Sequence, residues 1–357
     1  MTRETIVATR LQAQLLHKPT FNTAPEVVKH FGAMQAQDYP MSLFAVGVRS
    51  PGSTYAQIEQ ALDDGHIIRT HVLRPTWHLA PAEDIGWMLE LTSENILRQM
   101  KSMNAKLGLD AKLFTKSADI IMKAVSDGEH KTRDELTAIL NAHSIRTDQY
   151  RGLHILAYAE LQGLICNGRR AGKHHSYALM SERVKHPRRL GKEAALAELA
   201  LRYFTSHGPA TLRDFIWWSG LLVAEAKTAV ALTEKELANS TMDGEVYYWK
   251  EAGHAPTDRK VMLLPSFDEY LIAYKNRRAA IDEKHMPHAF TSNGIFKPLI
   301  VSGGEVVGVW KRTDKKNRVE IEPTFLKKVS KAVEKDTLDA AERFGLFLGK
   351  EASVRSR

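Results

Sequence analysis

Three helix starts of one kind recur along this chain and limit what it can fold into. Each is a threonine followed three residues later by an acid, and the threonines are Thr23, Thr132 and Thr211. The threonine hydroxyl can accept a hydrogen bond from a free N–H of the first helical turn, while the acid accepts from the N–H of the threonine. Each site predicts the N-terminus of an amphipathic helix. Three of them indicate a chain built from repeated helical units.

The surroundings of each start predict a winged helix-turn-helix. A helix precedes the start, a further helical stretch follows it, and two short β-rich runs joined by a turn complete the unit. The second unit has the clearest pattern. Its helices are expected over 112–126, 132–140 and 148–162, and its strands over 164–169 and 176–180.

The other two units follow the same plan. The third has a helix over 192–206, a capped second helix and a hairpin whose Asp243-Gly244 pair is a strong two-residue turn signal. The first has a helix over 4–16, a capped helix, and a hairpin of residues 67–79 that turns at Arg74-Pro75.

Basic residues in the second unit are candidates for contact with DNA. Arg151 and His154 are expected on the outward face of its third helix, and Arg169, Arg170 and Lys173 lie in the loop between its strands. The chain has 50 Lys and Arg against 42 Asp and Glu, a formal charge of +8, which favours a polyanionic partner. Such modules also serve protein contacts in proteins that never bind nucleic acid. Three in tandem in a basic chain favour DNA.

After residue 256 the sequence changes character. Short β-type runs separated by turns precede a charged helix, expected over 324–347. The runs are 261–265, 299–302, 306–310 and 318–321. Lys311 and Arg312, directly after the third run, are further candidate DNA contacts, and residues from Lys350 onward are expected to form a mobile basic tail.

Together these elements predict an α+β fold that is mostly helical. Three tandem winged helix-turn-helix domains are followed by a small β-barrel-like domain and a C-terminal helix. The expected divisions are 1–107, 108–190, 191–255, 256–323 and 324–357.

Several classes of protein are excluded by what the sequence lacks. Cys166 is the single cysteine, so there is no disulfide framework, and no Cys/His spacing is typical of zinc. No phosphate loop, nucleophile elbow or carboxylate dyad appears at diagnostic spacing. The N-terminus does not resemble a signal peptide, and no apolar run approaches membrane length. We therefore expect a cytoplasmic monomer with no metal, no cofactor and no membrane contact.

Two glutamines stand out in the first unit. Gln35 continues the apolar stripe of the helix that Thr23 caps, and Gln37 follows before Asp38-Tyr39-Pro40 breaks the helix. A pair of glutamines at a helix end commonly satisfies backbone groups of the adjoining loop. Two facing amides can instead hold a water by donating to it and accepting from it. Such a site suits a reaction that needs an aimed water more than a strong base.

The hairpin of the first unit adds polar side chains near these amides. Strand alternation places Arg69 and His71 on one face, and Thr76 and His78 on a face opposite their apolar neighbours. The hairpin is therefore expected to present a polar face that supports the glutamine site. Histidines in strands are more often hydrogen-bonded packing residues than catalysts.

Four collinear stretches resemble the winged-helix DNA glycosylase family typified by AlkZ. They are 34–38, 74–79, 263–271 and 306–311, and they reach from the first unit to the β-rich region. The resemblance implies three tandem winged helices and a small β-barrel arranged as a C around duplex DNA. It also implies hydrolysis of the N-glycosidic bond of alkylated purines, with interstrand crosslinks among the substrates of some members.

The resemblance also assigns residues. The catalytic Gln-x-Gln of the family falls on Gln35 and Gln37, and its Thr-x-His falls on Thr76 and His78. A related branch, YcaQ-like, carries Asp at the second position. Gln37 therefore places the chain with the AlkZ-like branch.

The implied chemistry is consistent with two amides. Alkylation at N7 makes guanine cationic, so the leaving group is activated without a buried acid, and what remains is to orient a water and stabilise an oxocarbenium-like sugar. The site has no candidate for a catalytic lysine, which predicts a monofunctional glycosylase that acts on double-stranded DNA with alkylated bases. The alternatives are a non-enzymatic winged-helix DNA-binding regulator and a paralogue that recognises lesions without catalysis.

Overall fold

All three threonine-acid sites begin helices in the computed structural model, which describes residues 1–251 and 261–355. The acid accepts a hydrogen bond from the threonine N–H at 3.0 Å in Thr23–Glu26, 2.7 Å in Thr132–Glu135 and 3.0 Å in Thr211–Asp214. The predicted capping boxes are confirmed. A fourth box, in which Gln57 accepts from the Thr54 N–H, begins another helix of the first unit.

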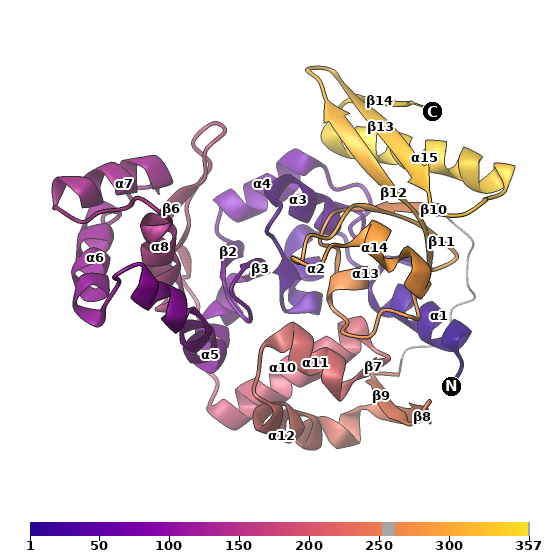
Figure 1. The fold of residues 1–357 in the computed structure, drawn as a ribbon, viewed down its shortest axis with the longest axis horizontal. Coiled ribbons are helices and arrows are strands. Elements are labelled where there is room, and N and C mark those ends of the chain that lie inside the picture. The colour runs from indigo at the N-terminus through magenta and orange to yellow at the C-terminus, as the bar shows by residue number, and fades with distance from the viewer. Residues whose placement is uncertain (252–260, 356–357) are drawn as a thin grey trace.

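The order helix, short strand, helix, helix, hairpin recurs three times (Figure 1), and each short strand pairs with the second strand of its hairpin. The first unit is α2 (Ala24–Phe31), β1 (Met34–Gln35), α3 (Tyr39–Gly47), α4 (Tyr55–Asp63), β2 (Ile67–His71) and β3 (Trp77–Pro81). The second is α6 (Ala111–Ala124), β4 (Lys131–Thr132), α7 (Arg133–Ala142), α8 (Arg151–Leu161), β5 (Ile165–Asn167) and β6 (Ser176–Leu179). The third is α10 (Lys192–His207), β7 (Ala210–Thr211), α11 (Leu212–Ser219), α12 (Val223–Thr233), β8 (Ala238–Met242) and β9 (Glu245–Trp249).

The first unit differs from the prediction in the helix that its threonine begins. In the second and third units the capping threonine begins the second helix, whereas Thr23 begins the first helix, α2. Gly32 ends α2 at a φ of +73°, a value that favours glycine. The Asp38 side chain then caps α3, and Pro40 is tolerated there because a first-turn N–H has no helical partner. Gln35 therefore lies on a strand, and the predicted helix break after it is a helix start.

The hairpin of the first unit divides its polar residues between two faces. The cross-strand pairs are Arg69 with Leu79, Thr70 with His78, and His71 with Trp77. Directly opposed residues of an antiparallel pair point to the same face of the sheet. His78 therefore lies on the face opposite Arg69 and His71, and the predicted single polar face is wrong. The loop between the strands sets this register, which the sequence pattern alone did not fix.

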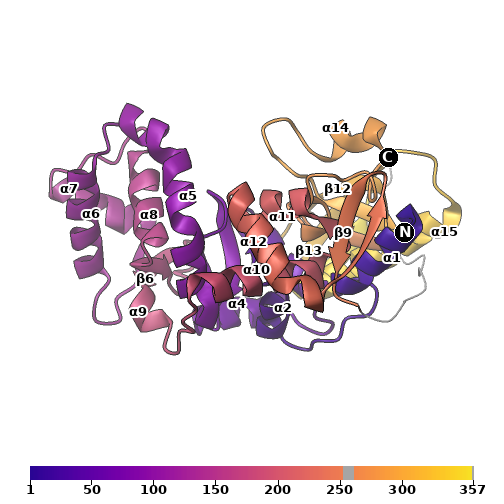
Figure 2. The same cartoon turned by 90° about the horizontal axis from the view of Figure 1, so that it is seen from below.

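The second unit stands at one end of the molecule in both views (Figures 1 and 2) and has a core of its own, which includes Phe114, Leu136 and Ile155. The 22-residue α5 (Ile85–Lys106), entered through η1 (Ala82–Asp84), joins it to the first unit. The first helix, α1 (Arg3–Ala13), packs elsewhere: its Val7 and Leu11 share a core cluster with residues of the C-terminal region.

The C-terminal region is a five-stranded open sheet covered by a helix. Its strands, in spatial order, are β10 (Val261–Leu264), β11 (Leu299–Ser302), β12 (Glu305–Asp314), β13 (Arg318–Phe325) and β14 (Glu351–Val354). All pairs are antiparallel except β13 with β14. The covering helix is α15 (Lys331–Leu348), and the remaining short helices are α9 (Met180–Arg183), η2 (Glu234–Glu236), α13 (Glu269–Ile272), η3 (Glu283–His285) and α14 (Met286–Ala289).

The α+β fold is confirmed, with two corrections near the C-terminus. Because β13 extends to Phe325, the last helix begins at Lys331 and not at 324. The predicted mobile tail is wrong over 351–354, where β14 adds to the sheet and Ala352 and Val354 pack against the core. The predicted domain boundary at 255 and the last two residues lie outside the described residues. The other predicted boundaries stay predictions.

Candidate active site

Gln35 lies on β1 with its side chain held between a cation and two polar neighbours. The residue is 5% exposed, and its Oε1 accepts a hydrogen bond from Arg74 Nη2 at 2.9 Å. Its Nε2 lies 3.4 Å from Thr76 Oγ1 and 3.5 Å from Gln37 Oε1. Because the cation engages the amide oxygen, the NH₂ end is directed toward Gln37. Among the residues that the structure describes, the Gln35 amide contacts side chains only, so it does not satisfy backbone groups of the adjoining loop.

Gln37 follows β1 and is exposed, with its Oε1 accepting from Thr76 Oγ1 at 3.3 Å. It lines a groove of about 600 Å³ between the first unit and the hairpin loop of the second. We name it the Gln37 groove, and its walls include Tyr39, Arg69, Trp77 and Lys173. The two amides therefore meet where the buried floor of the first unit reaches an open surface.

A buried carboxylate behind Gln35 fixes its backbone. Glu269 Oε1 accepts from the Gln35 N–H at 2.7 Å, and Glu269 Oε2 accepts from His207 Nε2 and Trp218 Nε1, both at 3.2 Å. Burial acts to raise the pKa of Glu269, but the hydrogen bond and charge of His207, with smaller help from Gln35 and Arg74, leave that pKa below its usual value. Sequence reasoning assigned Glu269 no role. The feature of the sequence that could have pointed to Glu269 is its place in the 263–271 stretch.

Arg69 holds the backbone between the two glutamines. Its Nε and Nη2 both donate to the Ala36 carbonyl oxygen, at 3.1 and 3.0 Å, and its guanidinium lies 4.7 Å from the Trp77 ring centre. Glu160 in turn accepts from Trp77 Nε1 at 3.3 Å and lies 2.6 Å from His71 Nδ1. Arg69 therefore supports the glutamine motif directly, whereas His71 contacts the second unit.

His78 is fully buried, with its Nδ1 3.1 Å from the Thr76 carbonyl oxygen. That contact requires the proton on Nδ1. Burial, followed by the charge of Arg74, lowers the pKa of His78 to about 3, so the ring is neutral at neutral pH. Its contact anchors the turn that carries Thr76 toward Gln35 and Gln37.

The predicted outward face of α8 instead contacts α5. Arg151 Nε donates to the Arg146 carbonyl oxygen at 3.0 Å, and Arg151 Nη1 donates to that of Leu107. His154 Nδ1 lies 2.6 Å from Asn104 Oδ1 on α5. Arg151 and His154 are therefore half-buried beside the C-terminal end of α5, which was not recognised as a packing partner of this unit, and their contact with DNA stays a prediction.

The hairpin loop of the second unit reaches across to the first. Arg170 N donates to Asp63 at 3.0 Å, its Nε lies 3.5 Å from Glu59 Oε1, and its guanidinium lies 5.0 Å from the Tyr39 ring centre. Lys173 is exposed in the wall of the Gln37 groove. Lys173 therefore lines the same groove as Gln37, and the expectation of a monofunctional enzyme stays a prediction.

The other basic candidates differ in exposure. Arg169 and Lys311 are exposed, whereas Arg312 is half-buried with its guanidinium 5.8 Å from the Phe344 ring centre. Arg169 and Lys311 are thus placed for contact with a polyanion. Arg312 is in part a packing residue.

Neither a metal centre nor a straight membrane span is found in the described part of the chain. Residues 1–251 and 261–355 contain no group of three or more His, Cys, Asp or Glu arranged to hold a metal ion. Within the same residues no single helix is long and apolar enough to cross a bilayer, and one pair, Leu212–Ser219 with Val223–Glu236, passes only as a bent unit at 119°.

Comparison with known proteins gives one consistent match. A family model described as DNA glycosylase AlkZ-like matches residues 28–347, a range that contains both glutamines and Glu269. A curated relative, an interstrand DNA cross-link repair glycosylase from Streptomyces sahachiroi, is 23% identical over 360 residues, or 96% of each chain. The solved structure of Streptomyces sahachiroi DNA glycosylase AlkZ superposes with a TM-score of 0.83 at 20% identity, and covers 99% of this chain and 100% of its own.

Proposed function

The chain belongs to the AlkZ-like DNA glycosylase family, and from this premise we propose that it hydrolyses the N-glycosidic bond of N7-alkylated guanine with a water held by Gln35 and Gln37. One observation carries the proposal. The Gln35 amide is oriented by Arg74 at 2.9 Å, beside an exposed Gln37 that lines an open groove. The three helix-helix-hairpin units are proposed to act as winged helices on the duplex.

The reaction follows from the charge of the lesion. N7 alkylation gives the base a positive charge, so the electron pair of the breaking C1′–N9 bond neutralises the departing base and no acid must protonate it. The water oxygen forms the new bond to C1′, and its proton is lost to solvent. An amide oxygen has two lone pairs, so the oxygens of Gln35 and Gln37, which already accept from Arg74 and Thr76, can each accept a further hydrogen bond from the water and aim it. Their partial negative charge favours the oxocarbenium-like sugar. Neither step needs a strong base.

Two finer proposals concern substrate and product. The named activity of the curated relative is interstrand cross-link repair, and we extend it to this chain because Gln37 is exposed. A crosslinked base tied to both strands cannot rotate into a closed pocket. We also propose a monofunctional enzyme that leaves an abasic site, with Lys173 serving DNA binding and not imine formation.

The test is single-turnover release of 7-methylguanine from a defined duplex. Gln37→Ala is expected to lower the rate about 100-fold or more, because a misplaced nucleophile loses most of the benefit of orientation. Duplex affinity should change far less. Gln99→Ala, an exposed glutamine on α5, is the matched control.

Two results would contradict parts of the proposal. Full activity of Gln37→Ala would remove the aimed-water mechanism. A covalent protein–DNA adduct trapped by borohydride in the wild type, and lost in Lys173→Ala, would replace the monofunctional mechanism with an imine one.

A further inference from the structure

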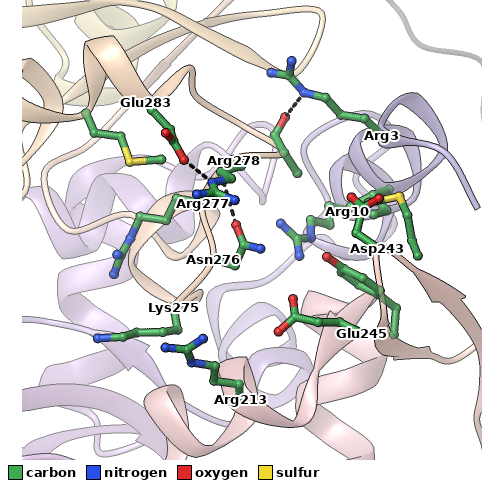
Figure 3. A pocket seen from close by; sticks show the side chains of 15 residues that line it. Arg3, Arg10, Arg213, Asp243, Glu245, Lys275, Asn276, Arg277, Arg278 and Glu283 are labelled. Atoms are coloured by element: carbon green, nitrogen blue, oxygen red, sulfur yellow. Dashed lines mark hydrogen bonds and ion pairs between the residues drawn. The ribbon is translucent and has the colours of Figure 1, made fainter.

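A second, strongly basic pocket lies away from the glutamines. It measures about 600 Å³ and is formed by α1, the tip of the β8–β9 hairpin and the loop of residues 275–279 (Figure 3). Its cationic side chains are Arg3, Arg10, Arg213, Lys275, Arg277 and Arg278. Its acidic side chains are Asp243, Glu245 and Glu283, and Glu283 is already paired with Arg278. The pocket therefore holds an excess of positive charge.

Arg10 gives this pocket a buried donor without an acceptor. The residue is 2% exposed, its Nε donates to the Pro209 carbonyl oxygen at 2.9 Å, and its guanidinium lies 3.7 Å from the Tyr274 ring centre. Its Nη1 is buried and has no hydrogen-bond partner among the residues described. In Figure 3 the Arg10 guanidinium extends into the pocket toward Asn276. A buried N–H group without a partner is costly, so an acceptor bound here would be favoured.

The basic loop beside Arg10 is held in place by one carboxylate. Asp214, the acid of the third capping box, also accepts from the Lys275 and Asn276 N–H groups at 2.8 and 3.0 Å. Arg277 Nε donates to the Leu271 carbonyl oxygen at 3.0 Å. Burial lowers the pKa of Arg277 to about 10, and the Asp214 charge offsets only part of this effect. The loop backbone and the Arg277 side chain are thus held in place by contacts within the protein.

We propose that this site, the Arg10 pocket, binds a phosphodiester group of the DNA substrate. Several cations around a guanidinium with one unpartnered N–H group suit an oxyanion that accepts several hydrogen bonds.

Trp217 connects the pocket to the catalytic amides. Lys275 Nζ lies 4.7 Å from the Trp217 ring centre, and the guanidinium of Arg74, the residue that orients Gln35, lies 5.8 Å from the same ring centre. This proximity favours a phosphate of the strand under repair over a small phosphate compound. The identity of the polymer rests on the proposed function.

The test compares two double variants of the full chain. Arg213→Gln/Lys275→Gln removes two exposed cations from the pocket, and Lys331→Gln/Lys335→Gln removes two exposed cations from α15. Both lower the net charge equally. Affinity for an undamaged duplex is measured from low to moderate salt. The pocket variant is expected to bind the duplex about tenfold more weakly than the wild type. The magnitude of its slope of log affinity against log salt concentration should fall by about 1, whereas the α15 variant should keep the wild-type slope.

Each outcome decides the proposal. Equal slopes for the two variants would overturn it. A second result would also overturn the proposal. If inorganic phosphate stabilised the wild type but not the pocket variant, and both bound the duplex equally well, the pocket would belong to a small phosphate compound. Binding of undamaged duplex does not require excision. If the wild type released no base, the proposed function would be wrong, but the salt dependence of duplex binding would still test the proposal for the Arg10 pocket.

Discussion

Arg74 is the residue that orients Gln35, because its Nη2 donates to the amide oxygen at 2.9 Å. Arg74→Met keeps the length of the side chain and removes the donor. Gln35 can then turn its amide, so we expect the single-turnover rate of base release to fall about tenfold. Duplex affinity should fall less than the rate. Arg98→Met on α5 is the control, and Arg74→Lys should restore part of the rate. Equal rates for Arg74→Met and the wild type would show that Gln35 is oriented by other contacts.

His78 makes stability depend on pH. The unfolded chain protonates this ring below about pH 6.5, whereas the folded state keeps it neutral down to about pH 3. Unfolding therefore takes up a proton between these values, and the free energy of unfolding falls as the pH falls. In His78→Asn this loss should be smaller by about 1.4 kcal/mol per pH unit. Urea denaturation at pH 5.5 and 4.5 measures it, with the exposed His288→Asn as control. A pH dependence identical to the wild type would contradict the buried neutral ring.

The sequence pattern placed Arg69 beside the two glutamines but missed Glu269. Gln35 and Gln37 form an unusual polar pair in an apolar stretch, and Arg69 was correctly expected beside them. Glu269 is distant in sequence, and its contact with the Gln35 N–H exists only after the C-terminal region packs on the first unit. Local periodicity carries no information on such a contact.

The third capping box joins two elements, whereas the second serves one. Asp214 is fully buried and accepts from four groups, two of them on the loop of Lys275. Glu135 is exposed and, among the residues that the structure describes, accepts only from Thr132. Asp214→Ala should therefore lower the free energy of unfolding by about 3 kcal/mol. Glu135→Ala should lower it by about 1 kcal/mol. Urea denaturation of both variants measures the difference. Equal losses would mean that the loop contacts of Asp214 contribute nothing.

Element boundaries were predictable where the turn chemistry was local. The Asp243-Gly244 turn joins β8 and β9 as expected. The first unit was misread because Thr23 and Asp38 both begin helices, and the sequence gives no rule for which start belongs to the second helix of the unit. The β14 strand was missed because a four-residue segment, Glu-Ala-Ser-Val, has little β signal until β13 offers it an edge.

Stretches that are distant in sequence meet at one place in the fold. The turn of residues 74–79 supplies Arg74, Thr76 and His78, and the 263–271 stretch supplies Glu269, all around Gln35. The second unit contributes from another direction, because its hairpin loop forms a wall of the Gln37 groove. The collinear order of these motifs was visible in the sequence. Their convergence depends on α5 and on the shared core of the first unit and the C-terminal sheet.

Arg170 and Lys173 lie three residues apart in that loop, and we expect Arg170 to stabilise the fold and Lys173 to bind DNA. Arg170 contacts Glu59 and Tyr39 of the first unit, whereas Lys173 is exposed in the groove wall. Lys173→Gln should leave the free energy of unfolding unchanged and reduce the salt slope of duplex binding by about 1, because it removes one phosphate contact.

Arg170→Gln should instead loosen the loop from the first unit. Its partners are partly shielded from solvent, so we expect a loss of about 1 kcal/mol in the free energy of unfolding and a salt slope close to that of the wild type. Fluorescence anisotropy at several salt concentrations, together with urea denaturation, separates the two effects. If both variants lowered the slope equally with no change in stability, the loop would be a free DNA-binding wing, and the contact between the units would not be what shapes the groove.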